Sequence, residues 1–319
     1  MYKYRNLVKP LTVRPVPFNL VPSDVSSFFM ESKDLEGYPG HFYITYLTKP
    51  CSLHPVDDNV MTSHPYDELL IFAGTNTDDI TDLRGEVSII IGEEREEYSF
   101  DKPTVVVIPK GTPHGQVRVR RLDAPIVHVM LGDSPSCVVD FREVKREPSK
   151  GSKYSRLVKK LTTSRSAYEE FRKLAPITID ERGVMDLRAI GPGEAYQSIL
   201  MQPEDLEGVK ICFSWEFAKD SGVWMSTRYA HVHPEPELLI MLSTDSQRIY
   251  DLGASLEFWF GSEREVYVID RPAVVTIPRP WIPHTPLITQ RANRPIIFML
   301  VCPGKYSLEG LVETGYDVF

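Results

Sequence analysis

Short runs of apolar residues, separated by turn-forming residues, recur along the whole chain. Five lie in the first half, at 42–47, 69–72, 87–91, 105–108 and 126–131, and five in the second, at 211–217, 238–242, 256–260, 274–277 and 296–301. Their spacing of roughly ten residues, with Gly, Pro and Asp between them, predicts the strands of a β-sandwich or barrel. Alternating strand and helix patterns are absent, so a parallel α/β fold is not expected.

The second half of the chain repeats the first. With a shift of 169 residues, positions 64 to 109 align without a gap, and His64 and Glu68 fall on His233 and Glu237. One inserted residue then brings His114 onto His284. A repeat of this length indicates duplication of a whole domain rather than a solenoid. We therefore predict two all-β domains, at 1–145 and 176–319.

The two predicted domains are joined by a basic linker at 146–175. The wider stretch from Arg142 to Arg165 holds nine Lys or Arg against two Glu, which favours a solvated linker over an anion-binding site. A short helix is expected near 166–174, with Ser164 or Ser166 as its cap. The segment 153–159 repeats the pattern of 3–9, so the duplicated unit begins before its barrel and carries an N-terminal arm.

The most distinctive chemistry lies in the C-terminal copy. His231 and His233 are two residues apart, so in a strand both imidazoles lie on one face. Glu237 follows after two prolines, and His284 follows an apolar run that predicts a strand. Imidazoles with a carboxylate suit Fe, Mn, Ni, Cu or Zn. The alternative is a group of surface histidines that only form hydrogen bonds, but this combination of spacings favours a metal site.

These motifs resemble the two metal-binding motifs of the cupin superfamily. The resemblance rests on His-x-His-x3-Glu at 231–237 and on a distant Pro-rich turn that ends in His284. It implies two tandem jelly-roll barrels, a bicupin, in which His231, His233, Glu237 and His284 bind one ion. Met225, Thr244 and Ile288 stand where cupins usually have Gly, Gly and Asn, so no subfamily is assigned.

The N-terminal copy retains only part of this motif. His64, Glu68 and His114 are present, but Thr62 stands where the C-terminal copy has His231. Two His and one carboxylate can form a three-ligand site with open positions. The three residues could equally be remnants held together by hydrogen bonds. We expect a full site in the C-terminal barrel and a weaker second ion, or none, in the N-terminal barrel. His54, in an irregular stretch beside Pro55, is not predicted as a ligand.

Composition indicates which partners, cofactors and cellular location to expect. A net charge of −8 disfavours nucleic acid as a partner, and no segment reaches membrane-spanning length or resembles a signal peptide. The four cysteines form no CxxC pair, and Cys212 and Cys302 lie in apolar runs, which suggests a reducing, cytoplasmic location. No P-loop or Rossmann motif supports a nucleotide cofactor. The expected partner is a small-molecule substrate, and a homo-oligomer is compatible with the sequence.

A metal held by four protein ligands keeps open positions for a substrate. Our first expectation is a metal-dependent enzyme, a dioxygenase, that acts on a small oxygen-rich organic molecule. A non-redox lyase, hydrolase, isomerase or decarboxylase on the same metal is the close alternative, and a binding bicupin without turnover is the third. We expect Glu237 to act as a ligand rather than a base. Tyr229 shares the face of His231 by strand alternation, so it is the candidate for proton transfer.

Overall fold

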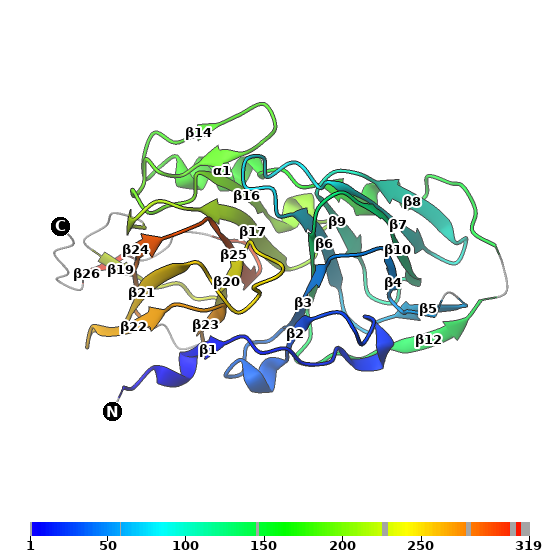
Figure 1. The fold of residues 1–319 in the computed structure, drawn as a ribbon, viewed down its shortest axis with the longest axis horizontal. Coiled ribbons are helices and arrows are strands. Elements are labelled where there is room, and N and C mark those ends of the chain that lie inside the picture. Colours follow the sequence, from blue (N-terminus) through cyan, green and yellow to red (C-terminus); the bar gives the residue numbers. More distant parts are fainter. Residues whose placement is uncertain are drawn as a thin grey trace. The chain divides into compact units, whose positions relative to one another are not determined.

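The computed structural model describes residues 2–57, 59–144, 147–224, 229–278, 282–306 and 311–313. The chain divides into two compact units. The N-terminal unit comprises Thr12–Leu161 and Leu206–Val209, and the C-terminal unit comprises Met1–Leu11, Thr162–Asp205 and Lys210–Phe319. The named strands of the described residues pair antiparallel. Figure 1 shows the strands as arrows along both units.

Two sheets form the N-terminal unit. The first runs β13-β9-β6-β11-β3-β2, which are Val158–Lys160, Thr104–Ile108, Glu68–Gly74, Ile126–Gly132, His41–Leu47 and Ser27–Met30. The second runs β12-β5-β10-β7-β8, which are Asp140–Glu143, Val60–Ser63, His114–Leu122, Gly85–Ile91 and Glu96–Phe100, with β4 (Cys51–Leu53) on β10. Short 3₁₀ turns lie at Pro17–Asn19, Ser32–Asp34 and Ser155–Leu157.

The C-terminal unit repeats this plan. One sheet runs β1-β23-β20-β25-β17-β16-β15-β14, which are Val8–Pro10, Ala273–Ile277, Glu237–Ser243, Ile296–Pro303, Ile211–Ala218, Gln197–Met201, Met185–Asp186 and Thr178–Ile179. The other runs β22-β21-β24-β19-β26, which are Glu265–Ile269, Ala254–Phe260, His284–Ala292, Tyr229–His231 and Leu311–Glu313, with β18 (Gly222–Val223) on β24. Short 3₁₀ turns lie at Arg5–Leu7 and Pro203–Asp205, and helix α1 spans Arg165–Phe171.

The two sheets of the C-terminal unit share one hydrophobic core. Leu239 and Leu300 come from the first sheet, and Phe258 and Phe260 come from the second, and all four belong to the same buried cluster. Burial of this apolar surface between two sheets is the main stabilising contribution in such a sandwich. The ten predicted strands are all present, and the all-β, two-barrel prediction is confirmed. Within the described residues, no helix is long and apolar enough to cross a membrane.

The N-terminal arm belongs to the C-terminal unit. Its strand β1 extends the sheet at β23, with Val8 opposite Val275 (Figure 1). The repeated arm at 153–161 belongs to the N-terminal unit, where β13 pairs with β9. The compact units therefore differ from the predicted domains, because residues 1–11 belong to the C-terminal unit and residues 153–161 belong to the N-terminal unit. The reason is that each arm completes the edge of a sheet, a long-range pairing that no local sequence pattern reveals.

A tyrosine anchors each arm on a Gly-x-Glu-Arg-Glu turn, which lies at 92–96 and recurs at 261–265. The Tyr4 hydroxyl donates to Glu263 at 2.9 Å, and the Tyr154 hydroxyl donates to Glu94 at 2.6 Å. The first glycine of each turn has a positive φ, and a Cβ at Gly92 would stand 2.1 Å from the Tyr154 ring. This turn therefore holds the arm, which explains why it recurs in both copies.

Candidate metal centres

Glu237 is the centre of the predicted C-terminal site. It begins β20, which directs its side chain into the barrel, where it is 2 % exposed. His233 lies in the turn before β20, and its Nε2 is 3.3 Å from Oε2 of Glu237. His284 begins β24 in the opposite sheet, and its Nε2 is 3.5 Å from the same oxygen. The structure thus brings together three residues that lie up to 51 positions apart, and their ligand atoms lie within 4.8 Å of one another.

Backbone carbonyls fix the orientation of both imidazoles. Nδ1 of His233 lies 2.6 Å from the Glu235 carbonyl, and Nδ1 of His284 lies 2.8 Å from the Ile282 carbonyl. A carbonyl only accepts, so each Nδ1 carries the proton, and Nε2 of a neutral ring presents its lone pair to the Glu237 carboxylate. In this form the lone pairs repel the carboxylate, so the arrangement requires positive charge, either a proton on Nε2 that is donated to Glu237 or a metal cation between the groups. A backbone carbonyl that accepts from the outer ring nitrogen in this way is typical of histidines that bind a metal.

The N-terminal unit reproduces this geometry. Nε2 of His64 and Nε2 of His114 each lie 3.2 Å from Oε2 of Glu68. Their Nδ1 atoms face the carbonyls of Val138 and Thr112 at 2.7 and 3.1 Å. All three side chains are at least 99 % buried. Within the described part of the chain, His64 Nε2 and Glu68 Oε1 have no hydrogen-bond partner, an arrangement that is costly unless a cation satisfies it.

A further histidine, His54, lies beside Glu68 and His114, although its sequence context did not predict it as a ligand. A ring nitrogen of His54 lies within 4.8 Å of the ligand atoms of Glu68 and His114. His54 follows β4, and its ring contacts the Tyr43 hydroxyl at 2.5 Å and His128 Nε2 at 2.8 Å. The irregular backbone beside Pro55 concealed this placement. The signal in the sequence is that Thr62 stands where the C-terminal copy has His231, which leaves the N-terminal set one imidazole short.

The sheet register confirms that Thr62 and His231 are equivalent. Thr62 pairs with His114 across β5 and β10, and His231 pairs with His284 across β19 and β24. The Thr62 hydroxyl donates to the His114 carbonyl at 3.2 Å. The side chains of His231 and Tyr229 lie outside the described residues, so the predicted roles of both remain predictions.

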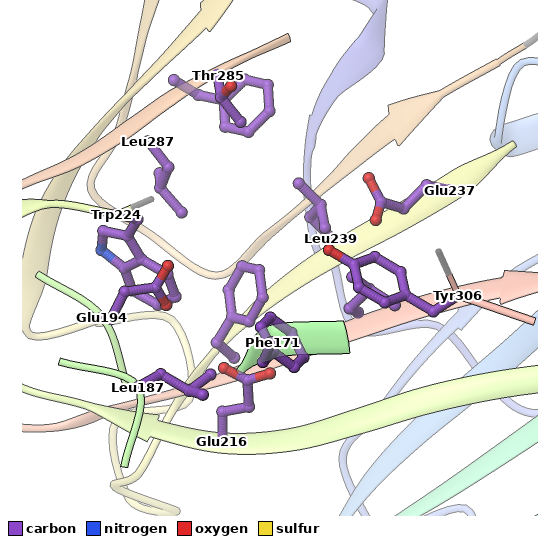
Figure 2. A pocket seen from close by; sticks show the side chains of 13 residues that line it. Phe171, Leu187, Glu194, Glu216, Trp224, Glu237, Leu239, Thr285, Leu287 and Tyr306 are labelled. Carbon is purple, nitrogen blue, oxygen red and sulfur yellow. The ribbon is translucent and has the colours of Figure 1, made fainter. Parts of the chain in front are cut away.

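A cavity extends from Glu237 into the C-terminal barrel (Figure 2). Its volume is about 60 Å³, and most of its lining is apolar. Three buried carboxyl groups border it: Glu194, Glu216 and Glu237 (Figure 2). None of the described residues that line it carries a positive charge. The other lining residues are Phe171, Leu187, Trp224, Leu239, Phe258, Thr285, Leu287, Phe298, Leu300 and Tyr306.

Two of these carboxyl groups have pKa values displaced in opposite directions. Burial alone would raise the pKa of Glu237, but the imidazoles of His233 and His284 hold it well below its usual range. Burial raises the pKa of Glu216 to about 7, because the serine hydroxyls beside it, Ser214 foremost, only partly offset the loss of water. Glu216 is therefore about half protonated at neutral pH. The sequence analysis missed it, because a single Glu in an apolar strand carries no motif.

The residues fit a divalent transition metal in both units. Each set offers neutral imidazole nitrogens and one carboxylate, which are the ligands that Fe, Mn, Ni, Cu and Zn share. Burial alone would favour protonated Glu68 and Glu237, but the histidines around them lower both pKa values, and a bound cation would act in the same direction. The predicted sets of His64, Glu68 and His114, and of His233, Glu237 and His284, each converge.

Solved structures similar to this chain include several of oxalate decarboxylase. One is an oxalate decarboxylase structure that concerns the substrate binding mode and a reaction specificity switch. Its sequence is 10% identical to this chain, and the alignment covers 94% of this chain and 77% of the other, with a TM-score of 0.54. Oxalate decarboxylase from Bacillus subtilis at pH 4.6 is 11% identical, with 94% and 77% coverage and a TM-score of 0.53. No family model and no curated protein sequence matches the chain. At this identity the similarity concerns the fold, and the fold of this chain is that of a bicupin, two cupin barrels in tandem, each with a His/Glu set suited to a metal.

Proposed function

We propose that this protein is a metal-dependent enzyme that acts without net oxidation on a small organic acid, with its reaction centre in the C-terminal unit. The similar structures are decarboxylases, which favours the non-redox alternative over the dioxygenase that we first expected. Fold alone does not select a reaction. The proposal therefore rests on the chemistry of the C-terminal cavity.

The observation that carries the proposal is the pair of Glu216 and Glu237 on one cavity. Two carboxyl groups with pKa values displaced in opposite directions are typical of an acid–base division of roles. Glu237 is held ionised and suits cation binding. Glu216 keeps a proton near neutral pH and can deliver it to a carbanion or enolate, or accept one in the reverse direction.

Different side chains of the C-terminal unit have different roles in the proposed reaction. His233, Glu237 and His284, with His231 as the predicted fourth ligand, would hold the metal. When bound, the metal supplies a Lewis acid that stabilises negative charge on substrate oxygen. Phe258, Leu287 and the other apolar side chains exclude water and suit a substrate with a hydrocarbon part. Glu216 exchanges the proton, a role that we first expected of Tyr229.

Screening with defined metals tests this proposal. The purified chain, stripped and reloaded separately with Mn, Fe, Co, Ni or Zn, is incubated with a panel of small acids: aliphatic, aromatic, hydroxy, 2-oxo and dicarboxylic. Products and CO₂ are measured with and without O₂. Turnover that persists without O₂ and consumes none supports the proposal. Stoichiometric O₂ uptake would restore the dioxygenase, and saturable binding without turnover in every metal form would identify a binding bicupin.

Two variants then assign the proton-transfer group. Glu216→Gln keeps the shape of the side chain but has no ionisable proton, so we expect unchanged metal content and a loss of turnover of about 100-fold or more. Tyr229→Phe tests the earlier candidate in the same assay. Loss of turnover in Tyr229→Phe, with Glu216→Gln unaffected, would return the role to the tyrosine.

A further inference from the structure

Two of the four cysteines face each other beside the C-terminal metal residues. Cys212 on β17 and Cys302 on β25 are direct cross-strand partners, and their Sγ atoms lie 2.6 Å apart. Both are buried, at 0 % and 3 % exposure. Directly opposite residues of an antiparallel pair lie on one face of the sheet, within the range of backbone separations that a disulfide can bridge.

The pair lies in the same cross-strand row as Glu237. In the N-terminal copy this row reads Glu68, Gly132 and His41, joined by direct pairing across β6, β11 and β3. In the C-terminal copy the pairing of Leu238 with Val301, continued by one residue, places Cys302 beside Glu237. The two thiols thus replace a glycine and a histidine, so the pair belongs to the C-terminal barrel alone.

A second cavity gives small molecules access to this row. It has a volume of about 300 Å³, and Cys302 lines it together with His233, Glu235 and Glu237. Hydrogen peroxide is small enough to enter such a space. Cys212 lies behind Cys302 as seen from this cavity, since only Cys302 is among the described lining residues. The arrangement therefore offers one thiol for attack by an oxidant and a second in contact with it.

We propose that Cys212 and Cys302 are an oxidisable thiol pair that forms a disulfide between β17 and β25. The thiolate of Cys302 attacks the O–O bond of peroxide, which gives a sulfenic acid and one water after proton transfer. The Cys212 thiol then attacks that sulfur, the S–S bond forms, and the sulfenic oxygen leaves as a second water. Two thiols are oxidised and one peroxide is reduced to two waters. A small thiol reverses the step by exchange.

The surroundings of the two thiols make the first step of this oxidation slow and the second step fast. The neighbouring Cys212 thiol and burial both raise the pKa of Cys302, so its thiolate is scarce at neutral pH. The second step needs no diffusion, because the two sulfurs are already in contact. We therefore expect no accumulation of the sulfenic acid.

Disulfide mapping of the whole protein tests the proposal. The purified chain is kept reduced or treated with hydrogen peroxide, then denatured in N-ethylmaleimide and digested without reduction. After peroxide, we expect mass spectrometry to find a reductant-sensitive pair of peptides joined through Cys212 and Cys302, lighter by two hydrogens than the free peptides. Cys51 and Cys137 should carry the label. Full labelling of all four cysteines, a sulfinic acid at Cys302 with Cys212 labelled, or a link to Cys51 or Cys137 would each overturn it.

Denaturation provides a second measurement that does not depend on the peptides. The oxidised protein should unfold at a higher urea concentration than the reduced protein, because the bridge restricts the unfolded chain. Cys302→Ser should abolish this difference, and Cys51→Ser, the matched control in the N-terminal unit, should keep it. Equal midpoints for oxidised and reduced wild-type protein would contradict a bridge. If Cys302→Ser does not fold, the wild-type mapping alone decides.

Discussion

Glu216 and Glu237 border the same cavity, yet the protein gives them opposite electrostatic surroundings. Glu237 faces two imidazoles, and its pKa lies well below the usual range. Glu216 faces serine hydroxyls and apolar side chains, and burial raises its pKa to about 7. One cavity therefore combines a permanent anion with a carboxylic acid that titrates near neutral pH.

The first prediction concerns stability and pH. The raised pKa means that folded Glu216 retains a proton that the unfolded chain releases, so folding is weakened as pH rises from 4.5 to about 7. The cost is about 1.4 kcal/mol per pH unit, or about 3 kcal/mol in total. Glu216→Gln should remove it. Urea unfolding at about pH 5 and pH 8 should show the variant gaining on wild type at the higher pH, whereas the exposed Glu181→Gln should track wild type. A constant difference between Glu216→Gln and wild type would contradict the raised pKa.

The second prediction concerns the number of bound ions. The expectation of a weak N-terminal site rested on Thr62. A ring nitrogen of His54 lies within 4.8 Å of the ligand atoms of Glu68 and His114, so we predict that His54 serves as the missing imidazole. Wild type loaded with Co²⁺ should hold about two ions per chain, and His54→Ala about one, because loss of a ligand weakens the site strongly. Equilibrium dialysis with elemental analysis measures this. Thr62→Val, the control, should keep both ions; the reverse order for the two variants would exclude His54 as a ligand.

The third prediction separates ligand from base at Glu237. An amide binds a cation more weakly than a carboxylate, so Glu237→Gln should lose metal and activity in step. Excess metal should restore part of both, as measured by metal content and by turnover of whichever acid the screen identifies. His233→Ala should likewise lose the C-terminal ion. A Glu237→Gln protein with full metal content and no turnover would make Glu237 the acid–base residue.

The fourth prediction concerns the arm. Gly92→Ala places a Cβ against the Tyr154 ring and also forces a positive φ on alanine, so it should destabilise the protein by about 2–4 kcal/mol. Gly37→Ala is the matched control, because φ is +84° there and nothing lies within 4 Å of the added Cβ. It should cost only about 1 kcal/mol. Equal denaturation midpoints for the two variants would show that Tyr154 does not anchor on this turn.

The sequence by itself determined the strands, the duplication and most of the candidate metal ligands. Strand alternation and turn residues are local properties, so runs such as 87–91 and 256–260 could be assigned without a fold. The spacing of His233 and Glu237 could also be recognised in the sequence, because His64 and Glu68 repeat it in the other copy. The helix predicted near 166–174 is α1, Arg165–Phe171, which begins one residue earlier and ends three residues earlier than predicted.

Only the tertiary structure decided which residues that are distant in the sequence lie in contact, and which of them are buried. His54 reaches Glu68 from an irregular segment, and Glu216 becomes an acid through burial, a property of its surroundings rather than of its neighbours in sequence. The contact between Cys212 and Cys302 depends on the register of two strands 90 residues apart. Each arm belongs to a unit other than the predicted one, because it completes a sheet edge that is distant in the sequence. Long-range pairing and desolvation arise only when the chain has folded, which is why sequence patterns do not contain them.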